Sequence, residues 1–567
     1  MKINKISRNN EFFIIIFGLL SFFFLQSDAV EVQIKSGKLK GATVTSRNGT
    51  KYYAFLGIPF AKPPIGDLRF EPPQEEDSWD GIRDATIPPP PCMQKDCMFS
   101  KNVFAAPVLG QEDCLYLNVF TPNVAVKRKL LPTVVVIHGG AFILGSSMFQ
   151  DPQYFMDFPV VVVSIQYRLS VFGFLSAVDD VLPGNYGMKD QVAALKWVQK
   201  NIESFGGDPN QVTICGESAG GGSVHLHMHS PLSKGLFHRA ISQSGSALAQ
   251  WVQTSPKLAR AKAYSFAILN GCPIDSTRAI VNCLKKVPAR ELMETHHKFY
   301  VFDFEPLIHF SIVTESKTVP GAFLTESPWT QGVLSNVPFM IGINSGEGGI
   351  KAAGYLSDLE KLKYLNKNYE RIFPLLLLYY QWTPAEKHSD VTKAIKEFYF
   401  GDEEINEKTA LNLVNLITDG YFTFDCIHAA LRHSTNTYFY YYDHRNVQTF
   451  NELFGFYKED LGVCHADDLI SLFYLPTLFE KVTEGDDFEV SQRMVNYWIN
   501  FIKTGNPNGD GDLWQPLKSE EFEYLHITTK EDKMKKRLLK ERYEFWKSLP
   551  IYLSRQTENF HTAKDEL

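Results

Sequence analysis

The sequence predicts an α/β fold, with a large, mixed and mostly parallel sheet that helices cover on both faces. Helical patterns alternate with short runs rich in valine and isoleucine, as in residues 190–202, where apolar side chains recur at helical spacing. Strands that alternate with helices are typical of a parallel sheet, and glycine or turn residues follow each run. The expected strands are residues 133–137, 159–165, 211–215, 339–343 and 438–442.

Length and composition indicate an ordinary globular protein. The chain has 567 residues, of which 44% are hydrophobic and 21% are charged. A net charge of −7, without an isolated basic block, makes nucleic acid an unexpected partner. Sheets of this class often exceed about 150 residues per domain. We therefore expect one domain over residues 30–563, with residues 351–406 as a helical insertion over the edge of the sheet.

The N-terminal segment resembles a secretory signal. Lys2, Lys5 and Arg8 precede an apolar run over residues 12–25, and small residues follow it up to Ala29. The alternative is a transmembrane anchor, but a bilayer needs about 20 apolar residues. We therefore expect residues 1–29 to be a signal peptide, and no later run is long enough to span a membrane.

The C-terminus, residues 564–567, reads Lys-Asp-Glu-Leu, which is the retention signal of the endoplasmic reticulum. The two ends of the chain support each other, because retention is meaningful only for a protein that enters the secretory route. The sequence thus predicts a soluble protein of the endoplasmic-reticulum lumen, with the KDEL receptor as a partner. Asn48, in Asn-Gly-Thr, is the expected glycosylation site.

Eight cysteines are too few for a disulfide scaffold, but an oxidising lumen permits a few bridges. Cys272 and Cys283 flank a short polar segment, and a bridge between them would stabilise the protein by about 3 kcal/mol. Three cysteines offer one more bridge with one thiol left over: Cys92, Cys97 and Cys114. Three isolated cysteines are expected to be buried free thiols: Cys215, Cys426 and Cys464.

The stretch ICGESAGG, residues 214–221, carries the central chemical signal of the chain. Ser218 lies between a predicted strand and a predicted helix, so its backbone has to turn sharply. Gly216 and Gly220 leave room where a side chain would collide across that turn. A turn with an incidental serine is the alternative, but the strand before and the helix after favour a nucleophile.

A second loop supplies the expected oxyanion hole. The predicted strand at residues 133–137 runs into the sequence His-Gly-Gly-Ala-Phe, a glycine-rich loop of the kind that offers backbone N–H groups to an oxyanion. We expect three backbone donors: Gly140, Ala141 and Ala219.

The chain resembles the type-B carboxylesterases, a family that includes cholinesterases and the non-enzymatic neuroligins. Residues 205–209 with 216–220 match the serine signature of that family, and residues 112–119 match its second signature. The similarity extends from residue 41 to about residue 546, and the pattern is most similar to insect carboxylesterases. The resemblance implies an α/β-hydrolase fold that requires no metal and no organic cofactor.

The resemblance also implies the other two members of a catalytic triad. Glu347 corresponds to the acid and His465 to the base, and the order serine, acid, histidine is that of an α/β-hydrolase. Asp467 and Asp468 are rival acids, but they are too close to His465 in the chain to reach its far ring nitrogen. The resemblance further implies two ion pairs and two bridges: Arg69 with Glu112, Arg168 with Asp208, Cys92 with Cys114, and Cys272 with Cys283. Cys97 departs from the usual spacing and competes with Cys92.

These residues predict a serine carboxylic ester hydrolase that cleaves small lipophilic esters through an acyl-enzyme. A cholinesterase would carry a tryptophan between Cys92 and Cys114 to bind a quaternary ammonium, and none is present. A juvenile-hormone esterase usually has glutamine where this chain has Glu217. A binding or adhesion protein is the third alternative, but the complete triad and the retention signal favour an enzyme.

Three histidines close to Ser218 offer an alternative reading as a metal site: His225, His227 and His229. On the predicted helix only the first and third share a face, and neither cysteine nor carboxylate completes a ligand set. We therefore expect packed or solvated histidines and no bound metal.

Overall fold

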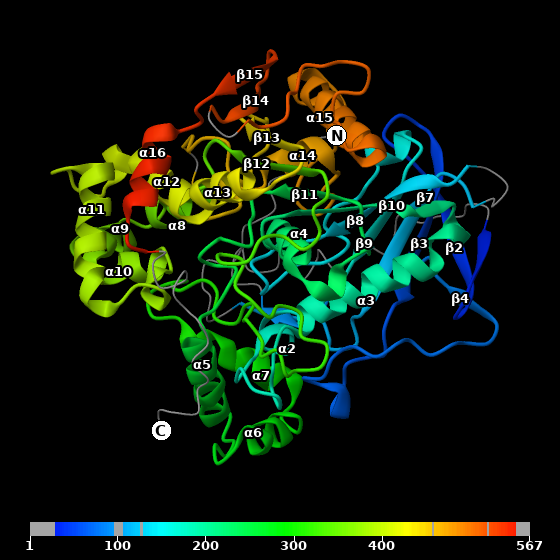
Figure 1. Ribbon diagram of the computed structural model, residues 1–567, viewed down its shortest axis with the longest axis horizontal. Helices are drawn as coiled ribbons and strands as arrows, with labels where there is room; N and C mark the ends of the chain where they lie inside the picture. The colour runs from blue at the N-terminus through cyan, green and yellow to red at the C-terminus, as the bar shows by residue number, and fades with distance from the viewer. Residues whose placement is uncertain are drawn as a thin grey trace, which may run out of the picture.

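A 13-stranded sheet runs through the molecule (Figure 1). The computed structural model describes residues 29–95, 106–124, 129–455, 457, 459–518 and 521–551. The strand order is β1-β2-β3-β7-β9-β8-β10-β11-β12-β13-β14-β15, and β4 pairs with β2. The strands are β1 (Val30–Ile34), β2 (Gly37–Thr45), β3 (Lys51–Pro59), β4 (Ile82–Asp84), β7 (Tyr116–Thr121), β8 (Leu131–Ile137), β9 (Val161–Ile165), β10 (Gly207–Glu217), β11 (Arg239–Gln243), β12 (Phe339–Asn344), β13 (Thr437–Tyr442), β14 (Glu523–Ile527) and β15 (Asp532–Lys536).

The centre of the sheet is parallel and its ends are antiparallel. All neighbours from β9 to β14 pair in parallel, whereas β1, β2, β3, β7 and β9 pair antiparallel, as do β14 and β15. A separate two-stranded sheet joins β5 (Gln94–Lys95) and β6 (Val108–Leu109). The predicted fold class, a mixed and mostly parallel sheet of the α/β-hydrolase kind, is confirmed.

Helices cover both faces of the parallel strands because these strands are apolar on both sides. Val135 and Ile137 of β8 belong to one hydrophobic core, with Leu195 of helix α3 (Tyr186–Asn201). Val134 and Val136 belong to a second core, with Trp498 of helix α15 (Gly485–Thr504). Figure 1 shows α3 and α15 on opposite sides of the strands. Alternate side chains of a strand point to opposite faces, so such a strand needs a cover on each side.

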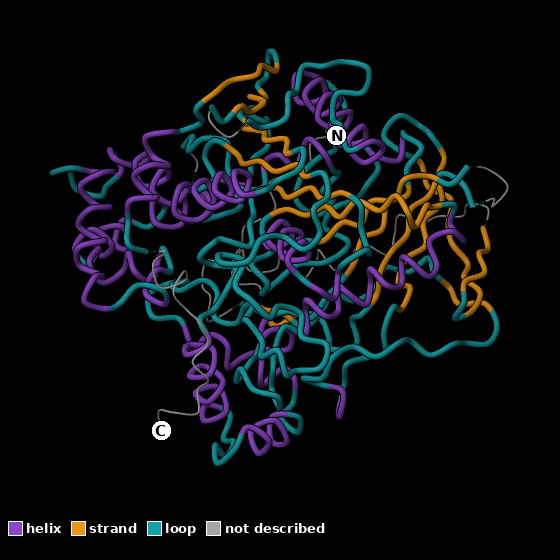
Figure 2. Tube along the Cα trace, in the orientation of Figure 1, coloured by secondary structure: helices purple, strands orange, loops and turns teal. Residues whose placement is uncertain are grey.

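The α-helices of the described residues are α2 (Ser170–Phe174), α3 (Tyr186–Asn201), α4 (Ala219–His229), α5 (Pro256–Leu269), α6 (Thr277–Leu284), α7 (Ala289–Thr295), α8 (Gly349–Leu356), α9 (Leu359–Lys367), α10 (Tyr369–Leu376), α11 (His388–Phe400), α12 (Ala410–Thr418), α13 (Phe424–Arg432), α14 (Asp467–Leu472), α15 (Gly485–Thr504) and α16 (Lys540–Ser548). Helices α9, α10 and α11 gather at the end of the molecule opposite the N-terminal strands (Figure 2). They occupy the region in which the sequence predicts a helical insertion.

The five predicted strands correspond to β8, β9, β10, β12 and β13, with small differences at their ends. The N-terminal strands, β11, β14 and β15 were not predicted. The predicted helix at residues 190–202 is α3, which begins earlier, at Tyr186. No helix in the described part of the chain is long and apolar enough to cross a membrane. The signal peptide up to residue 28 and the C-terminal signal at residues 564–567 lie outside the described residues.

Two disulfides join Cys92 to Cys114, with sulfurs 2.09 Å apart, and Cys272 to Cys283, with sulfurs 2.06 Å apart. Both predicted pairings are confirmed, and Cys97, the competing thiol, lies outside the described residues. The three isolated cysteines are free and buried, as expected.

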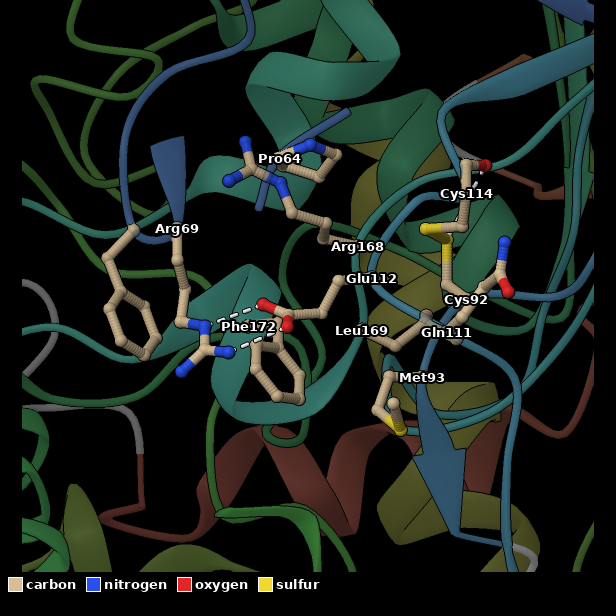
Figure 3. Close-up of a pocket in the computed structure, with 11 residues that line it drawn as sticks. Pro64, Arg69, Cys92, Met93, Gln111, Glu112, Cys114, Arg168, Leu169 and Phe172 are labelled. Carbon is tan, nitrogen blue, oxygen red and sulfur yellow. Dashed lines mark hydrogen bonds and ion pairs between the residues drawn. A yellow bond between two sulfur atoms is a disulfide. The ribbon is translucent and has the colours of Figure 1, made fainter. Parts of the chain in front are cut away.

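The first of the two expected ion pairs is present beside a disulfide (Figure 3). Arg69 Nε lies 2.6 Å from Glu112 Oε1, and the guanidinium also donates to the carbonyls of Leu284 and Val287. The surrounding cavity of about 10 Å³ holds about one water molecule at most, so this corner of the fold is structural.

The second expected ion pair, Arg168 with Asp208, is wrong. Arg168 instead pairs with Asp190 of α3, whose carboxylate accepts hydrogen bonds from Arg168 Nε and Nη2 at 2.8 and 2.7 Å. Asp208 accepts hydrogen bonds from Asn210 N and Gln211 Nε2, which lie beside it at the start of β10. The reason is burial, because the buried guanidinium needs a buried counter-charge, and Asp190 is fully buried whereas Asp208 is half-exposed.

Candidate active site

Ser218 occupies a strained turn between β10, which ends at Glu217, and α4, which begins at Ala219. Its φ of 58° and ψ of −121° lie in a region of backbone conformation that residues other than glycine rarely adopt. A Cβ atom on Gly216 would lie 2.8 Å from the carbonyl oxygen of Ile137, and one on Gly220 would lie 2.0 Å from it. The two glycines therefore allow the turn to pack against the end of β8.

Backbone hydrogen bonds hold this turn in place. The N–H of Ser218 donates to Gln243 O of β11 at 2.8 Å, and Gly222 N of α4 donates to Ser218 O at 2.8 Å. Ser218 retains 9% exposure although its neighbours are almost all buried. Its hydroxyl thus stands at the carboxyl end of the central strands, next to the N-terminus of α4, which favours developing negative charge.

The glycine-rich loop after β8 lies directly against this turn. A Cβ atom on Gly139 would be 3.1 Å from Ser218 Cβ. The next three residues all have positive φ, and Gly140 O accepts hydrogen bonds from Ile143 N and Leu144 N at 3.0 Å each. Among the described residues, no acceptor is assigned to the backbone N–H of Gly140, Ala141 or Ala219. Three unused donors beside a serine hydroxyl have the composition of an oxyanion hole.

His138 anchors this loop. Its ring stacks on Tyr167 at a centroid distance of 4.4 Å, and its Nδ1 lies 2.8 Å from Gly139 O. The hydroxyl of Tyr167 donates to His138 O at 2.9 Å. Burial lowers the pKa of His138 to about 4, so the ring is neutral at physiological pH and fixes the loop without adding charge.

Glu347 and His465 meet in the buried interior at the same edge of the sheet. Glu347 follows β12, and its Oε2 lies 2.6 Å from His465 Nδ1. Its Oε1 accepts hydrogen bonds from Ser244 Oγ at 2.5 Å and from Asn344 N at 2.7 Å. Because both oxygens are engaged, the carboxylate fixes the orientation of the imidazole.

The two rival acids point elsewhere. Asp467 accepts hydrogen bonds from the backbone N–H groups of Phe450 and Cys464, both at 2.8 Å. Asp468 accepts from Gln243 Nε2 at 2.8 Å and from Tyr440 Oη at 2.9 Å. Burial raises the pKa of Asp467 to about 7 and that of Asp468 to about 6. Neither carboxylate is the partner of His465 Nδ1.

A second carboxylate faces the other side of the imidazole. Glu217 Oε1 lies 3.0 Å from His465 Nε2, and this oxygen has no other hydrogen-bond partner among the described residues. Burial alone lowers the pKa of His465, but the negative charges of Glu217 and Glu347 outweigh it and raise the pKa to about 10. In the described residues no hydrogen bond joins Ser218 Oγ to His465. Glu217 was not predicted as a site residue, although its position next to Ser218 was an available signal.

An aromatic residue covers the imidazole from the side. Phe422 stacks on His465 at a centroid distance of 4.3 Å and belongs to a π-helical turn, Asp419–Thr423. Such turns occur mostly as local bulges and are frequent at functional sites. The adjacent Tyr421 lies beside Lys351, whose Nζ is 5.4 Å from the centre of its ring. Lys351 lines a cavity of about 300 Å³ between α8 and the loop at residues 303–307.

The three histidines of α4 are core residues. His227 Nε2 lies 2.9 Å from Gln191 Oε1, and His225 Nδ1 accepts a hydrogen bond from Ala247 N at 3.1 Å. Burial lowers the pKa of His227 and His229 to about 3 and holds that of His225 well below its usual value. No cluster of three potential metal ligands occurs within the part of the chain that the structure describes.

A serine raised on a glycine-flanked bend after a central strand, with an acid and a histidine beside it, is characteristic of serine hydrolases of the α/β-hydrolase fold. The comparisons with known proteins agree with this class. The model of the carboxylesterase family matches residues 28–546, and the chain belongs to that family. It is a carboxylic ester hydrolase of the serine type.

Named relatives extend the comparison. The chain is 39% identical over 518 residues to a juvenile hormone esterase of Tribolium castaneum, covering 88% of this chain and 87% of that protein. It is 37% identical over 526 residues to a carboxylic ester hydrolase of Bombus ignitus, covering 91% and 93%. The crystal structure of juvenile hormone esterase from Manduca sexta, with OTFP covalently attached, is similar with a TM-score of 0.81 and 28% identity. That match covers 93% of this chain and 100% of the other.

Proposed function

We propose that Ser218 is the nucleophile of this esterase, His465 its general base and Glu347 the acid that orients the base. The observation that carries this assignment is the 2.6 Å contact between Glu347 and His465 at the edge of the sheet where the strained Ser218 turn is placed. The backbone N–H groups of Gly140, Ala141 and Ala219 would form the oxyanion hole. This arrangement needs neither a metal nor an organic cofactor.

Hydrolysis then proceeds in two half-reactions. Ser218 Oγ attacks the ester carbonyl carbon as its proton passes to His465 Nε2, and the carbonyl oxygen becomes an oxyanion that the three N–H groups stabilise. The C–O bond to the alcohol breaks, and His465 returns the proton to the leaving oxygen. Water attacks the acyl-enzyme in the same way, releasing the carboxylic acid and restoring the serine.

The protonation state of His465 controls the first step. With Glu217 and Glu347 on its two sides, the imidazole holds a proton more firmly than a free histidine. It has to lose the proton on Nε2, and exchange the Glu217 contact for Ser218 Oγ, before it can act as a base. Glu217 therefore tunes the base from the position next to the nucleophile.

The proposed substrates are small lipophilic esters. Aromatic side chains beside the proposed triad support this assignment: Phe422 stacks on His465, and the ring of Trp251 lies 6.1 Å from that of Phe422. Two named relatives are a juvenile hormone esterase and a carboxylic ester hydrolase. Glu217, where juvenile-hormone esterases usually have glutamine, favours a broad esterase over a hormone esterase.

The proposed location is the lumen of the endoplasmic reticulum, with residues 1–29 as signal peptide and residues 564–567 bound by the KDEL receptor. Asn48 is proposed to carry a glycan, and its exposed position in the turn between β2 and β3 is compatible with one. Deletion of residues 564–567 should release the protein from expressing cells into the medium. Complete intracellular retention of the truncated protein would contradict the proposed location.

The function is tested by replacing the nucleophile. Ser218→Ala should lower kcat for 1-naphthyl acetate by about 10⁴-fold or more. It should also prevent covalent labelling by an organophosphate, which mass spectrometry of the labelled peptide detects. Ser316→Ala, a substitution of a partly exposed serine, is the matched control and should leave both readouts unchanged. Full turnover in the Ser218→Ala variant would overturn the assignment.

A further inference from the structure

A group of basic side chains lies buried away from the residues assigned to catalysis. Lys262 of α5, His296 after α7, and His309 of the following loop are 9%, 2% and 1% exposed. Lys262 Nζ donates to His309 O at 2.8 Å, and the rings of His296 and His309 are 5.0 Å apart. Three segments of the chain thus bring an ammonium and two imidazoles together.

No carboxylate of the described residues forms an ion pair with Lys262. Glu294, the acidic residue close to this group, pairs instead with Lys95, at 2.6 Å. The positive charges of Lys262, Lys95 and His297 all act on His296 in the same direction, lowering its pKa. Burial, without a compensating charge, lowers the pKa of Lys262 to about 7. A buried ammonium without a counter-ion is costly, because its hydration is lost and no opposite charge replaces it.

Hydrogen-bond donors in this group exceed the acceptors. Within the described part of the structure, His309 Nδ1 and Nε2 and His296 Nε2 have no hydrogen-bond partner. Lys262 has further N–H groups beyond the one bonded to the carbonyl, and each neutral imidazole has one N–H. The neighbouring side chains include aromatic rings, whose edges carry partial positive charge. These rings contact one another and the histidines: Phe266, Phe299 and Phe310.

We propose that Lys262, His296 and His309 form a binding site for a small monovalent anion of the halide type. Lys262 supplies the positive charge and two donors, and each neutral imidazole supplies at most one N–H donor beside it. A metal cation is disfavoured by the ammonium and by the absence of a described carboxylate facing it. The anion completes the charge balance of a buried cluster that joins α5 to the segment after α7.

Thermal unfolding of the purified full-length protein tests the proposal. The melting temperature is measured in sodium bromide, in sodium formate and in sodium gluconate, all at the same ionic strength. Bromide at ten times its Kd should raise the ratio of folded to unfolded protein about tenfold relative to gluconate, because it binds only the folded state. An effect of formate without one of bromide would identify a short carboxylate, such as an ester-hydrolysis product, as the anion and would refute the halide.

Two variants on the same helix locate the effect. Lys262→Met removes the charge and should abolish the bromide dependence, with no loss of melting temperature in gluconate and with unchanged esterase activity. Lys257→Met, at an exposed position of α5, should retain the dependence. Bromide dependence that persists in Lys262→Met, or its absence from the unmodified protein, would overturn the proposal.

A crystallographic experiment on the unmodified protein covers the case in which Lys262→Met does not fold. Crystals soaked in sodium bromide should show an anomalous peak within hydrogen-bond distance of Lys262 Nζ. Bromide peaks at the protein surface only would refute the site.

Discussion

Replacing Glu217 with glutamine tests how the charge next to the nucleophile controls the catalytic base. Glutamine keeps the shape of the side chain but removes the charge that lies 3.0 Å from His465 Nε2. At an effective dielectric constant of about 20, two unit charges at that distance interact by about 5 kcal/mol. This energy corresponds to a change of at most about four units in the pKa of His465. The actual change is smaller, because burial and the Glu347 carboxylate act on the same ring.

We therefore expect Glu217→Gln to lower the pKa of His465 by at least about one unit. The sign follows from the role of the base, since only the neutral imidazole can accept the proton of Ser218. Because its pKa is raised, His465 loses its proton only at alkaline pH. The kcat/KM of the unmodified enzyme therefore increases into the alkaline range. In the variant, the rising limb of the profile should move to lower pH.

The measurement is kcat/KM for 1-naphthyl acetate as a function of pH. Glu326→Gln is the matched control, because Glu326 is a partly exposed carboxylate that pairs with Lys317. It should leave the profile in place. A rising limb of Glu217→Gln at the same pH as that of the unmodified enzyme, or at higher pH, would refute the role assigned to Glu217.

Three substitutions test the supporting structure. Gly220→Ala places a Cβ atom 2.0 Å from Ile137 O, so we expect the free energy of unfolding, measured in urea, to fall by at least about 3 kcal/mol. A variant with the stability and activity of the unmodified protein would contradict the geometry of the turn. Asp190→Asn removes the charge of a buried ion pair and should lower the free energy of unfolding by about 3 to 5 kcal/mol, whereas Asp208→Asn should change it by no more than about 0.5 kcal/mol. A larger loss for Asp208→Asn than for Asp190→Asn would favour the pairing of Arg168 with Asp208. Cys272→Ser opens a disulfide of sequence separation 11 and should lower the free energy of unfolding by about 3 kcal/mol, and an unchanged urea midpoint would argue against that bridge in solution.

The central strands could be predicted from the sequence because they are buried on both faces. Residues such as Val134 and Val135 of β8 face opposite cores, so the strand reads as a continuous apolar run. The N-terminal strands were not identified, because β2 (Gly37–Thr45) mixes lysine, glycine and threonine and is only partly buried. Antiparallel strands near an edge need only one apolar face, and their signal is correspondingly weak.

One part of the site could be predicted from local sequence, whereas the others required family resemblance or the structure. The bend at Ser218 has a local signature, since its glycines lie within two residues of it. The pairing of Glu347 with His465 joins residues 118 apart and was available only through family resemblance. The approach of Glu217 to the imidazole depends on the backbone angles of the bend. The partner of Arg168 depends on which nearby carboxylate is buried, and the spacing of residues in the sequence does not reveal burial.

The close contact of Gly216 and Gly220 with the end of β8 has a consequence for how such an enzyme can diversify. The nucleophile after β10, the loop after β8 and the acid after β12 all lie at the ends of strands of one sheet, in which only β11 separates β10 from β12. Phe422, which covers the imidazole, comes instead from the π-helical turn Asp419–Thr423. Exchanging that turn on this scaffold should therefore change the range of accepted esters while the chemical step remains intact.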